Sequence, residues 1–257
     1  MPVIDPSTDS PALGIDLAAL RISHERLRAV LDPDRDGEDP NNPATVQAMP
    51  IVLHMPKNQQ IDRLELLEVA ARAVVKACLD ERAAGDTEYA AALQRWYGAR
   101  IRKIARRARN TAWERVQQVP GVTVSQGNAS ARACIPSPVQ DTDPLVTKLQ
   151  IGGTDLDASP QRPIHPGIAL IAVDAGLRMS VGKAAAQVGH GSMLLAAHST
   201  REWVSAWGSA GFPLQVREIS SPEFRRLAQR SDAVAVQDAG YTEVAPGSVT
   251  VVALAQP

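Results

Sequence analysis

The C-terminal third of the chain has the clearest succession of apolar and polar segments. Residues 167–173 form a short apolar run after a Pro-Gly pair, which predicts a buried strand. Ser180 then offers an N-cap for a helix. The pattern predicts helices over 181–198, 200–209 and 222–229, and further strands over 214–219, 233–237 and 248–255. The order of these elements is β-α-α-β-α-β-β, which predicts an α/β fold.

The middle of the chain predicts a second set of elements. An apolar run indicates a strand, apolar side chains at helical spacing indicate two long helices, and two short apolar runs indicate a hairpin. In order, these elements are a strand over 49–54, helices over 58–84 and 86–118, and hairpin strands over 120–124 and 131–136.

The distribution of turn-forming residues divides the chain. Residues 1–45 are acidic and rich in proline, with one short helical candidate at 17–31, and predict a mobile tail. Residues 46–150 predict a smaller, helix-rich α/β domain that contains a basic helix. Residues 151–166 predict a linker, and 167–257 predict a C-terminal domain. The sequence reveals no internal repeat.

Composition restricts the class of protein. The chain has 257 residues, 44% of them apolar, which is enough for one large or two modest cores, and a formal net charge of -1. The chain lacks both an apolar run long enough to cross a membrane and a signal-peptide pattern, so we expect a soluble, cytoplasmic protein. Cys78 and Cys134 are too few for a disulfide framework and lack metal-ligand spacing to the histidines. We therefore expect no metal and no cofactor.

One helix face carries candidate chemistry. Lys183, Gln187 and His190 are spaced so that all three project from nearly one face of the helix at 181–198. A lysine in the first turn of a helix is unfavourable unless an anion is near, so a phosphate or a developing oxyanion would suit this position. The alternative interpretation is an ordinary solvated helix face.

A second polar stretch, at 237–250, adds a recognisable motif. The pattern Lys183-x-Ala-Ala-Gln187-x-x-His190, followed by Asp238-Ala-Gly-x-Thr242 and then Ala-Pro-Gly, resembles the second-type (archaeal and eukaryotic) peptidyl-tRNA hydrolase family over the last third of the chain. Each motif alone could be structural, because Asp-Ala-Gly and Pro-Gly are common in turns. Together, in a strand–turn–helix context, they favour a functional site.

The resemblance implies a four-stranded mixed sheet sandwiched by helices. It also implies a metal-free esterase that cleaves peptidyl-tRNA between the peptide and the terminal ribose, which recycles tRNA in translation. The family's functional positions match Lys183, Asp238, Gln187, Thr242 and Thr250. Chemically, Asp238 could orient or deprotonate a water and Lys183 could stabilise the oxyanion. The two threonines could orient the water or the ribose, and Gln187 could bind the peptide carbonyl.

The tRNA-binding positions are less regular. Where the family usually carries an arginine and then an acidic residue, this chain has Asp174 and Gly176. It also has Ser180-Val181 in place of Gly-Lys and Tyr241 in place of an arginine, so three of the usual cations are missing. Phosphate neutralisation usually dominates nucleic-acid affinity, so we expect tRNA contacts elsewhere. Trp96 and Trp113 could stack on bases or anchor the core. The candidate tRNA-binding residues are His190, Arg178, Arg100, Arg102, Lys103, Arg106, Arg107 and Arg109.

Three functions remain open at this point. The first is hydrolysis of peptidyl-tRNA, the second is a catalytically weakened RNA- or protein-binding module on the same fold, and the third is hydrolysis of another ester or amide. The retained set of lysine, glutamine, aspartate and threonines favours an enzyme over a binding module. The resemblance implies peptidyl-tRNA as the partner and leaves a homodimer open as the assembly.

Overall fold

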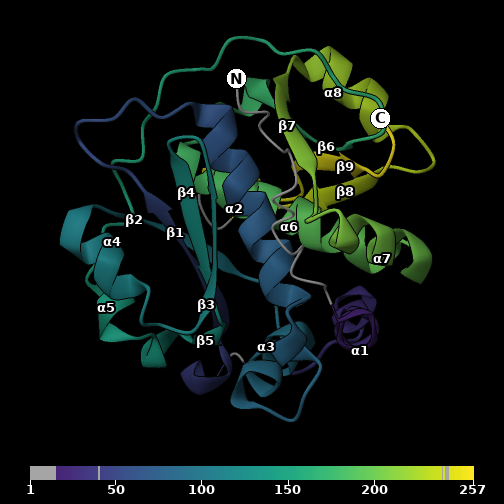
Figure 1. The fold of residues 1–257 in the computed structure, drawn as a ribbon. Coiled ribbons are helices and arrows are strands. Elements are labelled where there is room, and N and C mark those ends of the chain that lie inside the picture. The colour runs from purple at the N-terminus through teal and green to yellow at the C-terminus, as the bar shows by residue number, and fades with distance from the viewer. Residues whose placement is uncertain (1–15, 40, 239, 241–242) are drawn as a thin grey trace, which may run out of the picture.

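Two β-sheets organise the chain. In the computed structural model, which describes residues 16–39, 41–238, 240 and 243–257, the first sheet has the strand order β2-β1-β4-β3, with the short β5 paired to β1. The second sheet has the order β7-β6-β9-β8 (Figure 1). The predicted α/β fold with a four-stranded mixed C-terminal sheet is therefore confirmed.

The bounds of the elements are as follows. The strands are β1 Gln47–His54, β2 Lys103–Ala108, β3 Gly121–Gln126, β4 Ala129–Cys134, β5 Ser137–Pro138, β6 Ala169–Asp174, β7 Leu214–Ile219, β8 Val234–Gln237 and β9 Val249–Leu254. The α-helices are α1 Leu17–Leu27, α2 Arg63–Cys78, α3 Glu88–Gly98, α4 Asn110–Val116, α5 Pro144–Thr147, α6 Val181–His198, α7 Arg201–Ser209 and α8 Ser221–Ala228.

The two sheets belong to units with the same topology. The N-terminal unit (47–134) and the C-terminal unit (169–254) both run β-α-α-β-α-β-β. In each unit the first and second strands are parallel, and the fourth strand is antiparallel to the first and third. The sequence itself reveals no internal repeat, so the repetition lies in the topology of the two units and not in a repeated sequence.

The registers of the two sheets also correspond. Ile51 on β1 pairs with Ala105 and Ala133, while Ile171 on β6 pairs with Val216 and Ala253. Each isoleucine therefore lies between a residue of the parallel neighbour and a residue of the antiparallel neighbour. The first, second and fourth strands of the two units can therefore be aligned residue by residue, whereas β8 pairs with β9 through a register shift between Val236 and Gln237.

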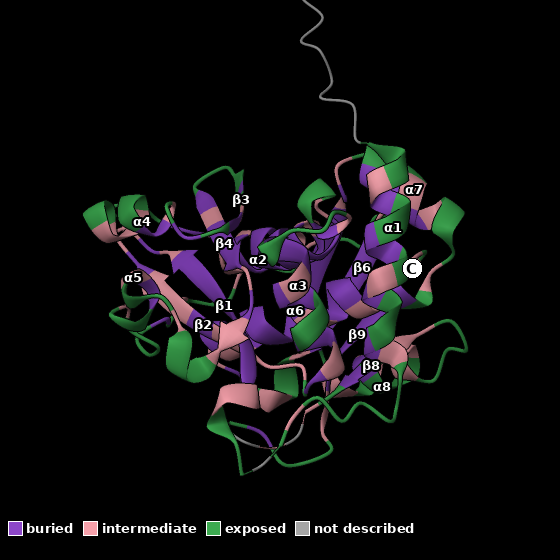
Figure 2. Ribbon diagram, turned by 90° about the horizontal axis from the view of Figure 1, so that it is seen from below, coloured by how far each residue is buried: buried purple, intermediate pink, exposed green. Residues whose placement is uncertain are grey.

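Helices α2 and α6 lie side by side between the two sheets (Figure 1). Their contact is close, because the Ser192 hydroxyl of α6 donates to the Ala71 carbonyl of α2 at 2.8 Å, and a Cβ added at Gly189 would lie 2.9 Å from Val74. Each helix also contacts the second strand of the opposite sheet. Both helices are buried over most of their surface, and the sheets and these helices hold most of the core (Figure 2).

Helix α1 connects part of the predicted tail to the folded body. Asp16 caps its N-terminus, Leu20 and Leu27 are buried in the main core, and the ring of His24 bonds to the Ala196 carbonyl at 2.9 Å. Burial lowers the pKa of His24. Residues 17–31 therefore pack on the body, whereas 1–15 lie outside the described residues.

The prediction of one long basic helix over 86–118 is wrong. Helix α3 ends at Gly98, and the arginine-rich segment that follows is strand β2, which pairs in parallel with β1. The residues of this segment suit a helix, but strand pairing overrides local propensity here. Its basic side chains therefore point alternately to two faces of a sheet and cannot form one helical stripe.

Aromatic and sulfur side chains of the N-terminal unit serve the core. Trp96 is fully buried, and Trp113 stacks on His54 with ring centroids 4.7 Å apart. Cys78 and Cys134 are free and buried. Within the described part of the chain, none of the helices has the length and apolar character needed to cross a membrane.

Candidate active site

The N-terminus of α6 is held by residues from three different segments. The Ser180 side chain accepts from the Lys183 backbone N–H at 3.1 Å, as expected of an N-cap. The Glu243 carboxylate accepts from the Ser180 N–H at 2.7 Å and from its hydroxyl at 2.6 Å. Thr154 accepts from the Gly182 N–H at 3.1 Å. Two orphan N–H groups of the first turn, those of Gly182 and Lys183, are thus bonded to protein side chains.

Four of the residues predicted for the site form one chain of contacts. Lys183 Nζ lies 2.5 Å from Asp238 Oδ2, and Gln187 Nε2 donates to the same oxygen at 2.7 Å. The Thr250 hydroxyl donates to Gln187 Oε1 at 2.7 Å. Residues from α6, from β9 and from the end of β8 therefore meet at one point, as the two sequence motifs predict.

The backbone after β8 fixes the position of Asp238. Its Oδ1 accepts from the Gly240 N–H at 2.8 Å, and its N–H and carbonyl bond to Ser248 and Gly247. Gly240 has φ +78°, and a Cβ there would lie 2.4 Å from Pro246 Cγ, so a side chain would not fit. Asp238 therefore serves both as a turn-forming residue and as the partner of Lys183.

The ion pair is nearly shielded from water. The side chains of Lys183 and Asp238 are 11% and 9% exposed, respectively. A carboxylate can accept about four hydrogen bonds, and the contacts from Lys183, Gln187 and Gly240 occupy three of these positions. Among the described residues, Oδ2 takes two of these contacts and Oδ1 takes one.

His190 lies on α6 but belongs to a different environment. Burial lowers the pKa of its imidazole well below the usual value, and the nearby cations Lys103, Lys183 and Arg35 lower it further. His190 is therefore a neutral ring at neutral pH, facing the N-terminal unit. The sequence placed it in the helix correctly but could not reveal which groups surround it.

Lys103 is the cation that β2 contributes to this environment. Its Nζ lies 2.9 Å from Met193 Sδ and 4.8 Å from the centroid of the Trp96 ring. Burial lowers its pKa to about 7. The lysine is thus enclosed by apolar and aromatic groups from both units.

This lysine should make the stability of the protein depend on pH. Its folded-state pKa lies below its unfolded-state pKa, so the unfolded chain binds more protons between pH 7 and 10, and the free energy of unfolding rises with pH over that range. We expect Lys103→Met to remove this rise. At pH 7 the substitution should stabilise the protein by roughly 2 to 4 kcal/mol, since one pKa unit corresponds to about 1.4 kcal/mol. Urea unfolding at pH 7 and pH 10 measures both effects.

The exposed Lys148 offers a matched control for this prediction. Lys148→Met should leave the pH dependence of unfolding as it is in the wild type. A Lys103→Met protein with the wild-type rise in stability between pH 7 and 10 would contradict the assignment.

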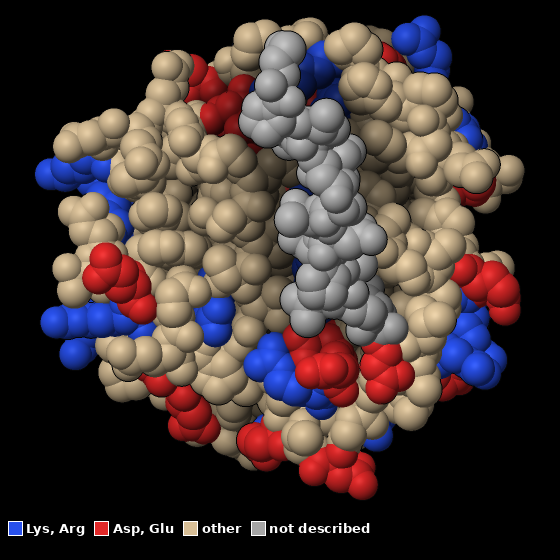
Figure 3. Space-filling model, viewed as in Figure 1, with Lys and Arg blue, Asp and Glu red and all other residues tan. Residues whose placement is uncertain are grey.

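The other candidate tRNA-binding residues do not gather on one surface. Arg106 donates to the carbonyls of Thr147 and Leu149, Arg107 donates to the Gly153 carbonyl, and Arg102 pairs with Glu38. On the face drawn in Figure 3, basic and acidic side chains of the described residues are interspersed, and acidic groups are frequent along the lower edge. These arginines therefore tie neighbouring segments together.

The remaining predicted positions are Arg178, Arg100, Arg109 and Thr242. Arg178 is exposed just before α6 and has a left-handed backbone with φ 47°, and Arg100 is exposed after α3. Arg109 precedes α4 and is half-buried. Thr242 lies outside the described residues.

Two further residues contact the site and were missed from the sequence. Thr154 lies in the predicted linker, and Glu243 lies next to the Asp-Ala-Gly motif, but neither belongs to a pattern that marks a site. Their roles depend on contacts across 28 and 63 residues of sequence. Only the folded structure brings these pairs together.

The C-terminal unit is similar in sequence to known proteins. The family model described as peptidyl-tRNA hydrolase PTH2 matches residues 168–257. A peptidyl-tRNA hydrolase of Metallosphaera sedula is 33% identical over 92 residues, which are 32% of this chain and 79% of the relative. The chain belongs to the peptidyl-tRNA hydrolase PTH2 family. A second peptidyl-tRNA hydrolase, of Thermoplasma acidophilum, is 35% identical over 94 residues, which are 33% of this chain and 80% of the relative.

The match to peptidyl-tRNA hydrolase PTH2 has a clear boundary. It covers the C-terminal unit, which carries Lys183, Gln187, Asp238 and Thr250. The N-terminal unit lies before the matched range, although it repeats the topology of the matched part.

Proposed function

We propose that the protein hydrolyses the ester bond between peptide and tRNA in peptidyl-tRNA, and that the C-terminal unit carries the active site. The observation that carries this proposal is the nearly buried pair of Lys183 and Asp238, in which Lys183 contacts Oδ2 and the Gly240 N–H donates to Oδ1. The membership of the family supports the choice of substrate. Of the three candidate functions, both observations favour an esterase acting on peptidyl-tRNA.

In this proposal, the ester is attacked by a water bound to Asp238. The carboxylate orients the water and accepts its proton as the oxygen attacks the carbonyl carbon. Lys183 contacts the same carboxylate, and in this proposal its ammonium group stabilises the negative charge that develops on the carbonyl oxygen. The tetrahedral intermediate then collapses, and the ribose oxygen leaves with the proton that Asp238 accepted from the water. The products are the tRNA and the peptide, whose new carboxyl group releases its remaining proton to solvent.

Gln187 and Thr250 take positioning roles. The Gln187 amide donates to Asp238 and accepts from Thr250, and the exposed fraction of Thr250 is 0%. A fully buried hydroxyl cannot reach the ribose, so the direct contact with substrate expected for Thr250 is replaced by an indirect one. Thr250 orients Gln187, which in turn orients Asp238. Exposed Arg178, two residues before Ser180, is suited to contact a tRNA phosphate.

The substrate class can be tested with two closely matched RNAs. Purified full-length protein should release N-acetyl-phenylalanine from N-acetyl-phenylalanyl-tRNA. It should act at least tenfold more slowly on phenylalanyl-tRNA, whose free α-amino group is charged. Equal rates on both would show a general aminoacyl ester hydrolase and would remove the peptidyl preference.

The alternative function is a catalytically weakened binding module. The direct contact between Lys183 and Asp238 favours this alternative. A lysine and an aspartate that pair with each other can stabilise the fold without taking part in a reaction. In that case the wild-type protein would bind N-acetyl-phenylalanyl-tRNA without releasing product.

A further inference from the structure

The N-terminal unit has a position that corresponds to each residue of the candidate active site. Both main helices follow an N-cap residue, Asp62 or Ser180, so the third helical residue is Glu65 in α2 and Lys183 in α6. The strand registers extend the correspondence to the third and fourth strands. Lys183, Gln187, Asp238 and Thr250 correspond to Glu65, Val69, Gln126 and Ser130.

The chemistry of the site is missing at these corresponding positions. A carboxylate takes the place of the lysine, and an apolar side chain takes the place of Gln187. The loop that carries Asp238 is reduced to a tight turn, in which a Cβ added at Gly127 would lie 3.2 Å from Glu65 Oε2. With a carboxylate in place of its cation, this end of the N-terminal unit cannot stabilise an oxyanion in the proposed way.

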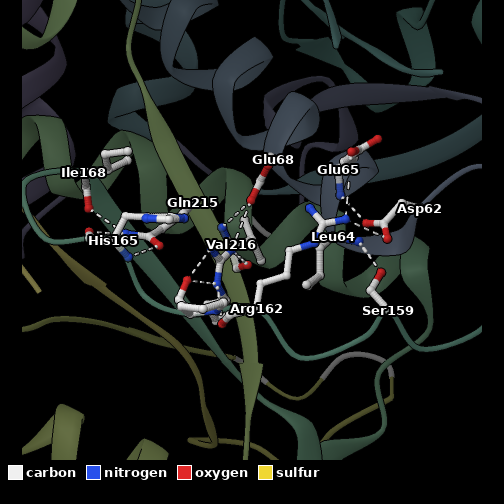
Figure 4. Close-up of polar contacts among 12 residues, drawn as sticks. Asp62, Leu64, Glu65, Glu68, Ser159, Arg162, His165, Ile168, Gln215 and Val216 are labelled. Atoms are coloured by element: carbon white, nitrogen blue, oxygen red, sulfur yellow. Dashed lines mark hydrogen bonds and ion pairs between the residues drawn. The ribbon is translucent and has the colours of Figure 1, made fainter. Parts of the chain in front are cut away.

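The linker covers this end of the N-terminal unit. Arg162 lies 2.9 Å from Asp62 and 3.8 Å from Glu65, and Ser159 Oγ accepts from the Leu64 N–H at 3.1 Å (Figure 4). The segment that joins the two units therefore occupies the place where a substrate would approach in the C-terminal unit.

The contacts between the units are reciprocal. Helix α2 reaches strand β7, where the Glu68 carboxylate accepts from the Val216 N–H at 3.1 Å, and α6 reaches strand β2. The second residue of each helix donates to a linker hydroxyl, Leu64 to Ser159 and Gly182 to Thr154. Reciprocal contacts of this kind are typical of a two-fold interface between identical subunits.

We propose that the N-terminal unit is a non-catalytic copy of the fold that takes the place of a partner subunit and positions the catalytic helix of the C-terminal unit. The surface of α6 that a second copy would need is covered by α2 of the same chain. The protein is then a monomer with one active site. The catalytic part of this inference rests on the proposed function.

Thr154 and Arg63 are the positioning residues. Thr154 is 2% exposed and holds the Gly182 N–H, one residue before Lys183. Arg63, the first residue of α2, donates to the Met179 carbonyl at 2.9 Å and pairs with Glu218 of β7. Together they fix the start of α6, and with it the location of the Lys183 ammonium group.

Thr154→Val and the matched control Ser159→Ala test this role. Thr154→Val removes the hydroxyl bonded to the second N–H of α6, and Ser159→Ala removes the hydroxyl bonded to the second N–H of α2. Of these two helices, only α6 carries Lys183. We expect kcat on N-acetyl-phenylalanyl-tRNA to fall about tenfold in Thr154→Val, with KM within twofold of wild type, and to recover in Thr154→Ser. Ser159→Ala should keep wild-type kcat. Equal losses of kcat in both variants would overturn the positioning role.

Two readouts do not require activity. Amide hydrogen exchange at Gly182 and Lys183 should quicken in Thr154→Val and stay unchanged in Ser159→Ala, whereas unchanged exchange in Thr154→Val would overturn the contact. Light scattering of the full chain should give the monomer mass of 27.4 kDa. A stable dimer would overturn the idea that the N-terminal unit replaces a subunit. If wild type lacks turnover, the proposed function fails, while these two readouts still decide this inference.

Discussion

Lys183→Met should lower kcat/KM on N-acetyl-phenylalanyl-tRNA by about 100-fold to 1,000-fold. The expected size follows from the removal of a preorganised donor next to a developing oxyanion, which typically costs this much in kcat. The lysine side chain is 11% exposed, so water cannot easily take over its role. Steady-state kinetics separates a loss of oxyanion stabilisation from a loss of substrate binding. We expect kcat to fall and KM to change little.

Lys148→Met is the matched control for this substitution. Lys148 is exposed and lies outside the C-terminal unit, so its loss removes one positive charge without touching the site. We expect wild-type kcat from this variant. Full activity in Lys183→Met, with unchanged tRNA binding, would rule out the oxyanion role.

Asp238→Asn should lower kcat by at least about 100-fold, because an amide cannot accept the proton of the attacking water. The side chain keeps its shape, and its oxygen can still accept from the Gly240 N–H. The substitution leaves Lys183 without its anionic partner in a nearly buried position. We therefore also expect a loss of about 3 kcal/mol in the free energy of unfolding. Single-turnover kinetics and urea unfolding measure the two effects.

The double variant Lys183→Met/Asp238→Asn distinguishes catalysis from stability. Removing both charges also removes the nearly buried ammonium group that loses its carboxylate in Asp238→Asn, so the double variant should be more stable than Asp238→Asn alone. Its activity should remain as low as that of the single variants, because residues that act as one unit are not additive. Recovery of activity together with stability would mean that Asp238 serves only the fold.

The C-terminal unit was largely predictable from the sequence. Its strands are short apolar runs, and Ser180 caps α6 at the predicted residue, so local signals and the final structure agree. The spacing of Lys183 and Gln187 on one helix face also predicted that both could reach the same point. The second motif and the predicted order of the strands indicated that Asp238 would lie near Lys183 and Gln187.

The N-terminal unit was predicted less well for a physical reason. The segment at 103–108 is rich in arginine and alanine, which suit a helix, and only its pairing with β1 makes it a strand. The repeated topology could not be predicted from the sequence, because corresponding positions of the two units carry different types of side chain. Glu65 and Lys183 are one such pair. Topology is preserved by burial and register, which different side chains can satisfy.

The buried contacts around the site could not be predicted from local pattern. The role of Thr250 depends on its full burial and on its bond to Gln187. The environment of His190 depends on Lys103, which comes from the other unit. Such relations arise from tertiary packing over long sequence separations.

The most direct test is the release of N-acetyl-phenylalanine from N-acetyl-phenylalanyl-tRNA by the purified full-length protein, with Asp238→Asn in parallel. We predict multiple turnovers by wild type and a rate at least about 100-fold lower for the variant. Tight binding of this tRNA by wild type without product release would contradict the hydrolase assignment and would indicate a binding protein on the same fold.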